Sequence, residues 1–277
     1  MKKNKKAIKS NSVFIVRQLL KIPGVKVSRE AFLLEAFTDY VSGTDHKAEL
    51  LEKGPTEIFN QETVDKIALR KIKAATKSAT MMSFVTGIPG GFAILGTLPV
   101  DTVQIYATTL KLAQELSYIY GAEDIWYKDS EEITEAEDQL LVYLGVMMGV
   151  NVAASATRML SNTLSKTVLE KLPNHVFQQT IVHHVAKKTL KLLGLKSSKK
   201  ALSQGLAKAI PLAGGIFSGG LTYFGIKPMG YRLQKVLSES VYGYDDSQAQ
   251  EDLELLLLEY NEEHRQANEW VRSDEVI

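Results

Sequence analysis

The chain has 277 residues, of which 45% are hydrophobic and 23% charged, and its formal net charge is +1. This composition is typical of a globular protein and differs from that of a disordered chain or a polytopic membrane protein. Because the chain contains no cysteine, disulfides, zinc–thiolate sites and cysteine nucleophiles are excluded.

The charges are separated into blocks along the chain. Residues 1–29 carry nine Lys and Arg and no acid, whereas residues 30–157 carry nine bases and nineteen acids. Between residues 158 and 235 there are thirteen bases and one acid, and residues 245–277 carry eleven acids and two bases. Such blocks either pair with each other inside the fold or turn a basic surface toward an anionic partner, such as lipid headgroups or nucleic acid.

The N-terminal part predicts two helices separated by a break. A basic amphipathic segment over residues 12–21 ends before Pro23, and no small-residue cleavage site follows, so we do not expect a signal peptide. Ser28 is placed to cap a helix over residues 29–41, where large apolar residues recur at helical spacing. Residues 43–55 are polar and predict a turn-like connection.

The first of two uncharged sequences runs from Ser78 to Val100 and reads SATMMSFVTGIPGGFAILGTLPV. A long helix that starts near residue 60 should continue into it until Gly87 and Pro89 end the helix. A helix that meets water normally carries charge on one face. An uncharged, glycine-rich sequence is therefore expected to be buried against protein or against lipid.

The helix that follows, over residues 101–120, is apolar almost all round, because only Asp101, Lys111 and Glu115 are charged. We expect it to be buried. Under a structural interpretation, Asp101 satisfies free backbone N–H groups in the first turn of the helix. Under a functional one, it is a lone acid with a raised pKa in an apolar cavity.

Further helices are expected in the second half of the chain. Thr134 and Glu137 form a capping box, which predicts one long helix through residue 160. Gly145 and Gly149 are four residues apart within it, a spacing that permits close helix–helix approach. Two basic helices are expected between residues 174 and 210.

The second uncharged sequence, AIPLAGGIFSGGLTYFGI, spans residues 209–226 and follows the pattern of the first. In both, Ile-Pro opens a glycine-rich run and Tyr-Gly closes the helix that follows. Pro89 and Gly121 are 32 residues apart, and so are Pro211 and Gly243. The two sequences therefore predict two equivalent apolar helical hairpins.

The C-terminal sequence predicts an acidic amphipathic helix over residues 247–271. Ser247 and Gln250 would form its capping box. Its apolar side is most simply packed on the basic half of the body.

Motifs of known chemistry are absent from the sequence. It contains no phosphate-binding loop, no GxSxG elbow and no HExxH motif. The five histidines are His46, His175, His183, His184 and His264. His183 and His184 are adjacent and point in different directions on a helix, and the other three do not have the spacing of metal ligands. The basic block has few aromatic residues and no nucleic-acid recognition motif. We therefore predict no catalytic residue, no metal, no cofactor and no nucleic-acid partner.

Residues 87–121, GIPGGFAILGTLPVDTVQIYATTLKLAQELSYIYG, resemble the core of the EcsC protein family of bacteria. Residues 209–237 resemble the C-terminal half of that family, and the resemblance covers residues 60–245. The sequence IPGVKVSREAFL is similar to a lead-in of this family and of helical domains attached to Era-like GTPases. The motif residues are Gly87, Pro89, Gly90, Gly91, Pro99, Asp101, Tyr120, Gly121, Pro211, Gly214, Gly215, Tyr242 and Gly243.

The resemblance implies an accessory, membrane-associated role, because the family is named for a gene neighbour of an ABC transporter tied to protein secretion. It supplies no catalytic residue. The expected localisation is the bacterial cytoplasm, at the inner face of the cell membrane. The expected partners are the membrane surface or bilayer and an ABC transporter or other membrane protein, with residues 1–29 and 158–208 facing lipid headgroups.

We therefore expect an all-α bundle of nine to eleven helices, with the two glycine-rich hairpins at its centre. The expected parts are a basic lead-in over residues 1–59, an EcsC-like helical domain over 60–245 and an acidic helix over 246–277. The preferred function is that of a non-enzymatic membrane-associated accessory protein. The alternatives are a soluble helical interaction module for a GTPase or ATPase, and an enzyme that uses Asp101 in an apolar cavity.

Overall fold

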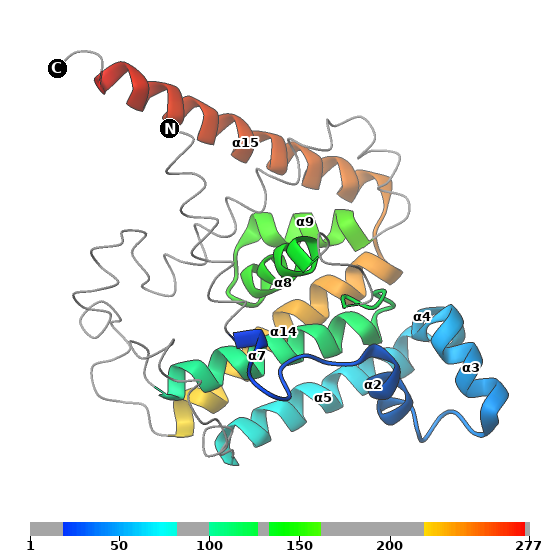
Figure 1. Cartoon of the computed structure of the whole chain (residues 1–277). Coiled ribbons are helices and arrows are strands. Elements are labelled where there is room, and N and C mark those ends of the chain that lie inside the picture. Colours follow the sequence, from blue (N-terminus) through cyan, green and yellow to red (C-terminus); the bar gives the residue numbers. More distant parts are fainter. Residues whose placement is uncertain (1–18, 82–99, 127–132, 162–218, 275–277) are drawn as a thin grey trace.

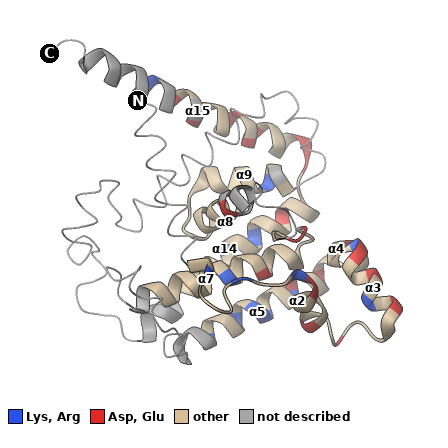
Figure 2. Ribbon diagram, in the orientation of Figure 1, with Lys and Arg blue, Asp and Glu red and all other residues tan. Residues whose placement is uncertain are grey.

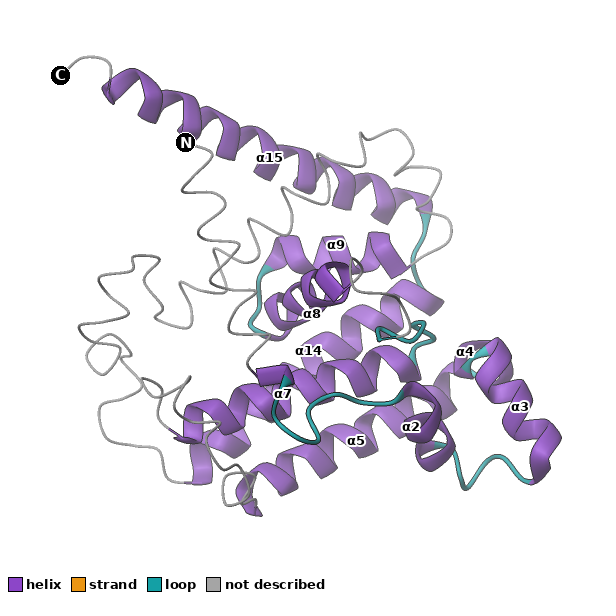
Figure 3. Ribbon diagram, viewed as in Figure 1, coloured by secondary structure: helices purple, strands orange, loops and turns teal. Residues whose placement is uncertain are grey.

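The computed structural model describes residues 19–81, 100–126, 133–161 and 219–274. Within these ranges the chain forms nine helices and no strand (Figures 1 and 3). The prediction of an all-α fold is confirmed for this part of the chain. The two predicted glycine-rich hairpins lie mostly outside the described residues.

Three short helices precede the main body: α2 (Arg29–Ala36), α3 (Gly43–Lys53) and α4 (Pro55–Ile58). The turn-like connection predicted over residues 43–55 is wrong, because α3 occupies it. This helix buries only Leu50, so it has no apolar stripe that a periodicity could show. Its support is local: Asp45 lies in the first turn, and Lys53 in the last turn pairs with Glu49 at 2.9 Å.

The centre of the body consists of three long helices: α5 (Gln61–Met81), α7 (Val100–Ile119) and α14 (Gly219–Tyr242). The prediction that the helix over 101–120 is buried is confirmed, since consecutive residues of α7 from Leu112 to Gln114 and from Leu116 to Ile119 are buried. The cover comes from the same chain, because α5, α8, α14 and α2 all pack against α7.

The helices form a stack of layers, with α5 at the bottom of Figure 1, α7 and α14 above it, then α8 and α9, and α15 at the top. α14 is the central helix, because it packs against α5, α7, α8 and α9. α14 belongs to the last part of the chain, yet it packs on α5, the first long helix, so the core joins elements that are far apart in sequence.

Three helix ends meet at one end of the body. α5 runs antiparallel to α7 and α14, so the C-terminal end of α5 lies beside the N-terminal ends of the other two (Figure 1). At the opposite end the three helices are joined by hydrogen bonds among Asp65, Tyr120 and Ser238. The helices continue from that junction for 16 to 20 residues, a distance of about 24–30 Å. We call the end where α5 stops and α7 and α14 begin the distal end.

The single helix predicted through residue 160 is wrong, because it consists of two helices, α8 (Ile133–Met147) and α9 (Asn151–Ser161). Gly149 ends α8 with a φ of 81°, and its N–H donates to the Val146 carbonyl at 2.9 Å. The next N–H donates to the Gly145 carbonyl, which completes a Schellman motif. Gly149 is thus a helix terminator rather than a helix-packing residue. Thr134 is not the N-cap that the predicted capping box requires, because α8 begins one residue earlier, at Ile133.

The C-terminal helix, α15 (Asp246–Asp274), packs on α9. Its capping box is not the predicted pair of Ser247 and Gln250. Instead the Gln248 N–H donates to Asp245 Oδ1 at 2.9 Å, and the Asp245 N–H donates to Gln248 Oε1 at 3.3 Å. The box therefore lies two residues earlier in the chain. None of the helices in the described ranges combines the length and apolar character needed to cross a bilayer.

Candidate functional site

The structure describes five of the thirteen predicted motif residues. The eight that lie outside the described residues are Gly87, Pro89, Gly90, Gly91, Pro99, Pro211, Gly214 and Gly215. Asp101 is the second residue of α7, which agrees with the predicted place in the first turn. The other four motif residues are the two Tyr-Gly pairs that follow α7 and end α14.

The first Tyr-Gly pair forms a tight turn after α7. Gly121 has a φ of 87°, and its N–H donates to the Tyr118 carbonyl while the Ala122 N–H donates to the Ser117 carbonyl. This is a second Schellman motif. A Cβ on Gly121 would lie 2.8 Å from Thr56 Oγ1. Glycine is therefore required both for the backbone conformation and for the contact with α4.

The hydroxyl of Tyr120 lies in a polar cluster that joins the three central helices. It donates to Asp65 Oδ1 on α5 at 2.5 Å. The same carboxylate oxygen accepts from Gln234 Nε2 at 3.2 Å and from Ser238 Oγ at 3.0 Å, both on α14. Gln61 Nε2 donates to Ser238 Oγ at 3.2 Å. We call these five residues the Asp65 junction.

The second Tyr-Gly pair approaches the same junction but differs from the first. Gly243 does not have a positive φ, and its N–H donates to the Glu239 carbonyl as in an ordinary helix. The Tyr242 hydroxyl is buried and has no hydrogen-bond partner among the described residues. Burial, together with the charges of Asp65 and Glu57, raises the pKa of Tyr242 to about 12. The two pairs are therefore not equivalent, because only Tyr120 bonds to Asp65.

The Asp65 junction is structural: its hydrogen bonds hold the three central helices together. Burial raises the pKa of Tyr120, and its hydrogen bond to the Asp65 carboxylate acts in the same direction. The phenol therefore stays protonated at neutral pH and serves as a donor rather than as a base. The junction satisfies several polar groups at once between helices that are 55 to 173 residues apart in sequence.

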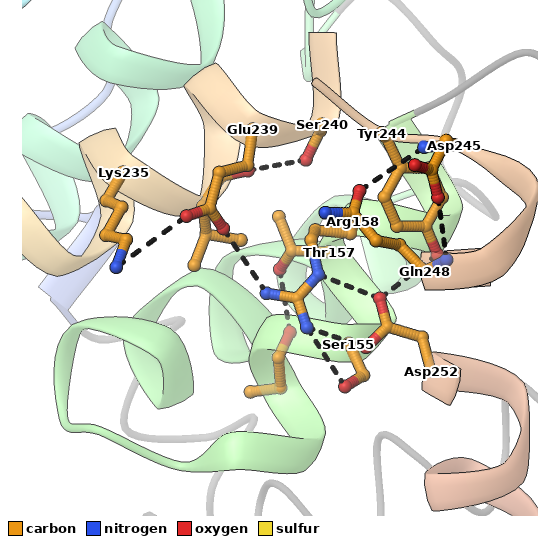
Figure 4. Close-up of polar contacts among 12 residues, drawn as sticks. Ser155, Thr157, Arg158, Lys235, Glu239, Ser240, Tyr244, Asp245, Gln248 and Asp252 are labelled. Carbon is orange, nitrogen blue, oxygen red and sulfur yellow. Dashed lines mark hydrogen bonds and ion pairs between the residues drawn. The ribbon is translucent and has the colours of Figure 1, made fainter. Parts of the chain in front are cut away.

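A second polar cluster attaches α15 to the body (Figure 4). Arg158 on α9 forms a bidentate ion pair with Asp252 on α15, with Nε 2.8 Å from Oδ2 and Nη2 2.6 Å from Oδ1. Tyr244 donates to Asp252 Oδ2 at 3.0 Å. Arg158 Nη1 also lies 3.6 Å from Glu239 Oε2 on α14. We call Arg158, Glu239, Tyr244 and Asp252 the Arg158 clasp.

The electrostatics of the clasp favour the charged form of both partners. Burial alone would raise the pKa of Asp252, but the hydrogen bonds from Arg158, Ser155 and Tyr244 outweigh it and hold the pKa below its ordinary value. The hydrogen bond to Asp252 raises the pKa of Arg158. Bidentate arginine–carboxylate pairs fix orientation as well as distance, so the clasp sets the angle at which α15 lies on α9.

Two arginines in the basic blocks are used inside the protein. Arg158 is held by Asp252, and Arg29 donates to the carbonyls of Ala122 and Leu51 at 3.0 Å each. These two side chains therefore do not belong to the lipid-facing surfaces predicted over residues 1–29 and 158–208.

Neither cluster was predicted from the sequence. Asp65 stands in a helix with many other charged residues, and nothing local distinguishes it from its neighbours. The charge blocks gave a partial signal for the clasp, because Arg158 begins a basic block and Asp252 lies in an acidic one. Among the residues that the structure describes, no group of three His, Cys, Asp or Glu could hold a metal ion.

In comparisons with family models, curated proteins and solved structures, the chain matches none of them.

Proposed function

We propose that the chain is a non-enzymatic, membrane-associated accessory protein that docks at the inner face of the bacterial cell membrane through its distal end. The observation that carries the proposal is the meeting of three helix ends there (Figure 1). The uncharged residues 82–99 link α5 to α7, and the uncharged residues 209–218 lead into α14. Both uncharged sequences therefore attach to the body at one place.

Because both uncharged sequences attach at one end, the helical body and the membrane-binding sequences have separate roles in this proposal. α7 is buried against other helices of the same chain, so it needs no lipid to cover it. In this proposal the uncharged residues 82–99 and 209–218 are the part of the chain that contacts the bilayer. The lysine-rich residues 1–29 and 158–208 support the same role. Each basic residue near an anionic leaflet contributes about 1 kcal/mol of attraction. The resemblance to the EcsC family adds an ABC transporter or another membrane protein as the proposed partner.

A second candidate function is a soluble helical interaction module for a GTPase or ATPase. The burial of α7 by other helices favours it, since a helix of this chain with only three charged residues can be covered by protein alone. The two functions differ in what covers residues 82–99 and 209–218, and a single experiment distinguishes them.

The experiment is to fractionate bacterial cells that express the full chain and to wash the membranes with carbonate and with high salt. We expect the protein in the membrane fraction. The double variant Phe92→Asp and Leu95→Asp should lower the membrane-bound fraction about tenfold or more, because an acid in an apolar environment is costly. Tyr40→Asp adds an acid at an exposed apolar position between α2 and α3 and should leave the membrane-bound fraction unchanged. A wild-type protein found wholly in the soluble fraction before any wash overturns the proposal and favours the interaction module.

A further inference from the structure

α15 is attached to the body only along its first third, as far as the described side chains show. Ala249, Asp252 and Leu256 are at most 5% exposed, and Asp252 is held by the Arg158 clasp (Figure 4). All of them lie within the first eleven residues of a 29-residue helix. The helix continues from Leu256 to Asp274, a further length of about 27 Å. Figure 1 shows this part extending past α9.

The part of α15 beyond the clasp presents leucines next to acids. Leu257 is 38% exposed and Leu258 is 62% exposed, which makes them two of the three exposed large hydrophobic residues in the described ranges. Glu254 and Glu262 are exposed and lie four residues before and after Leu258, on the same side of the helix. Figure 2 shows acidic residues along the same stretch. A leucine bordered by acids matches a basic segment that carries its own apolar residues.

The chain itself contains such a segment. Residues 162–208 carry nine lysines and one acid, interspersed with leucine, valine and isoleucine. This sequence begins directly after α9, the helix to which α15 is clasped. A tethered segment reaches its site at a high effective concentration, so a segment of the same chain competes well against any free partner.

We propose that the acidic leucine face of α15, formed by Glu254, Leu258 and Glu262, binds the lysine-rich sequence of residues 162–208 and thereby competes with anionic lipid for it. The inference rests on the proposed membrane association, which it supplements with a regulatory contact. The lysines cannot neutralise glutamates and lipid phosphates at the same time. Whichever anionic surface is present in excess holds them, and α15 sets the amount of anionic lipid needed for binding.

The test uses the full chain and vesicles of phosphatidylcholine with or without phosphatidylglycerol, measured by co-sedimentation. The triple variant Glu254→Gln, Leu258→Ser and Glu262→Gln removes the face without touching a buried residue. We expect it to reach half-saturation at about fivefold less anionic lipid than the wild type, because two competing charges are lost. The control, Glu30→Gln with Glu52→Gln, removes two exposed acids on α2 and α3 and should bind like the wild type.

The outcomes separate the two proposals. Equal binding of the triple variant and the wild type to anionic vesicles overturns this inference and leaves membrane association standing. Absence of both proteins from anionic vesicles overturns membrane association, and a second measurement then decides the contact within the chain.

That measurement uses the absence of native cysteine. Leu258→Cys combined with Lys191→Cys should give an intrachain cross-link with a short bismaleimide, and high salt should weaken it because exposed charges are screened. Tyr40→Cys with Lys191→Cys is the control and should give none. A cross-link between two copies, or to a different protein, shows another occupant of the α15 face and overturns the inference, as does the absence of any cross-link.

Discussion

Gly230 of α14 lies directly against Ile72 of α5. A Cβ on Gly230 would come within 3.0 Å of both Cγ1 and Cγ2 of Ile72, and within 3.1 Å of Leu112 Cδ2 on α7. All three residues are buried, so the three central helices make a close contact at a position that has no side chain. Glycine at this point sets the distance between α14 and its two neighbours.

Gly230→Ala should therefore destabilise the protein by about 1–3 kcal/mol, because the added methyl group must displace packed side chains. The measurement is urea denaturation followed by far-UV circular dichroism. Gly225→Ala is the matched control on the same helix, since a Cβ there meets nothing within 4 Å. We expect this variant to gain about 0.5–1 kcal/mol from the better helix propensity of alanine. Equal effects of the two substitutions would contradict the packing at Gly230.

The two tyrosines near Asp65 should respond differently to loss of the hydroxyl. Tyr120→Phe removes a donor to a carboxylate and should lower the free energy of unfolding by about 2 kcal/mol. Tyr242→Phe removes a buried hydroxyl that has no partner among the described residues, so it should be neutral or stabilising. Thermal unfolding of both variants checks the prediction. A larger loss for Tyr242→Phe would show that the junction is organised in another way.

The Arg158 clasp predicts a dependence of stability on acid pH. The pKa of Asp252 is lower in the folded protein than its ordinary value of 3.8, so the unfolded chain binds its proton first as the pH falls. The stabilisation is complete above pH 3.8 and is lost as the pH falls through the folded pKa. Asp252→Asn should flatten this part of the stability–pH curve. An unchanged curve in the variant would refute the role assigned to Asp252.

Breaking the clasp from the other side should cost more than an exposed ion pair does. Arg158→Met leaves the Asp252 carboxylate largely buried without its main partner, which should destabilise the protein by about 3 kcal/mol at neutral pH. Lys53→Met is the control, because it removes an exposed pair with Glu49 and should cost much less than the loss of Arg158. Urea titration of the two variants measures the difference, and equal losses would mean that the clasp is no stronger than a surface pair.

Two glycines with similar backbone angles separate backbone strain from close contact. Gly43 and Gly121 have φ values of 80° and 87°, but only Gly121 faces a neighbour, Thr56. Gly43→Ala should cost about 1 kcal/mol for the left-handed backbone alone, and Gly121→Ala should cost about 1–3 kcal/mol more. Chemical denaturation gives both values. If the two losses are the same, Thr56 moves aside without cost.

The sequence predicted those helices whose burial or boundaries are visible in the local sequence pattern. The burial of α7 was predicted because this helix has only three charged residues, and α5 was predicted as a long helix that starts near residue 60. α3 was missed because a helix with one buried residue, Leu50, resembles a polar loop. The end of α8 was missed because Gly149 also fits a helix-packing spacing, and only the backbone angle shows which role it has.

The polar clusters could be predicted only in part, because their partners are far apart in the chain. Ser238 is 173 residues from Asp65, and no local pattern selects either residue. Asp252 and Arg158 are 94 residues apart, yet the opposite charges of their blocks already favoured a contact between those regions. Bulk charge thus indicates which regions meet, and only the fold shows which side chains bond.

The central place of α14 has a consequence for synthesis of the protein. The ribosome makes α5 and α7 long before α14, whose last residue is Tyr242. Until then Ile72 and Leu112 lack the helix that covers them around Gly230. A nascent or truncated chain that stops before residue 219 leaves this surface open, so it should bind chaperones or aggregate rather than persist as a folded fragment.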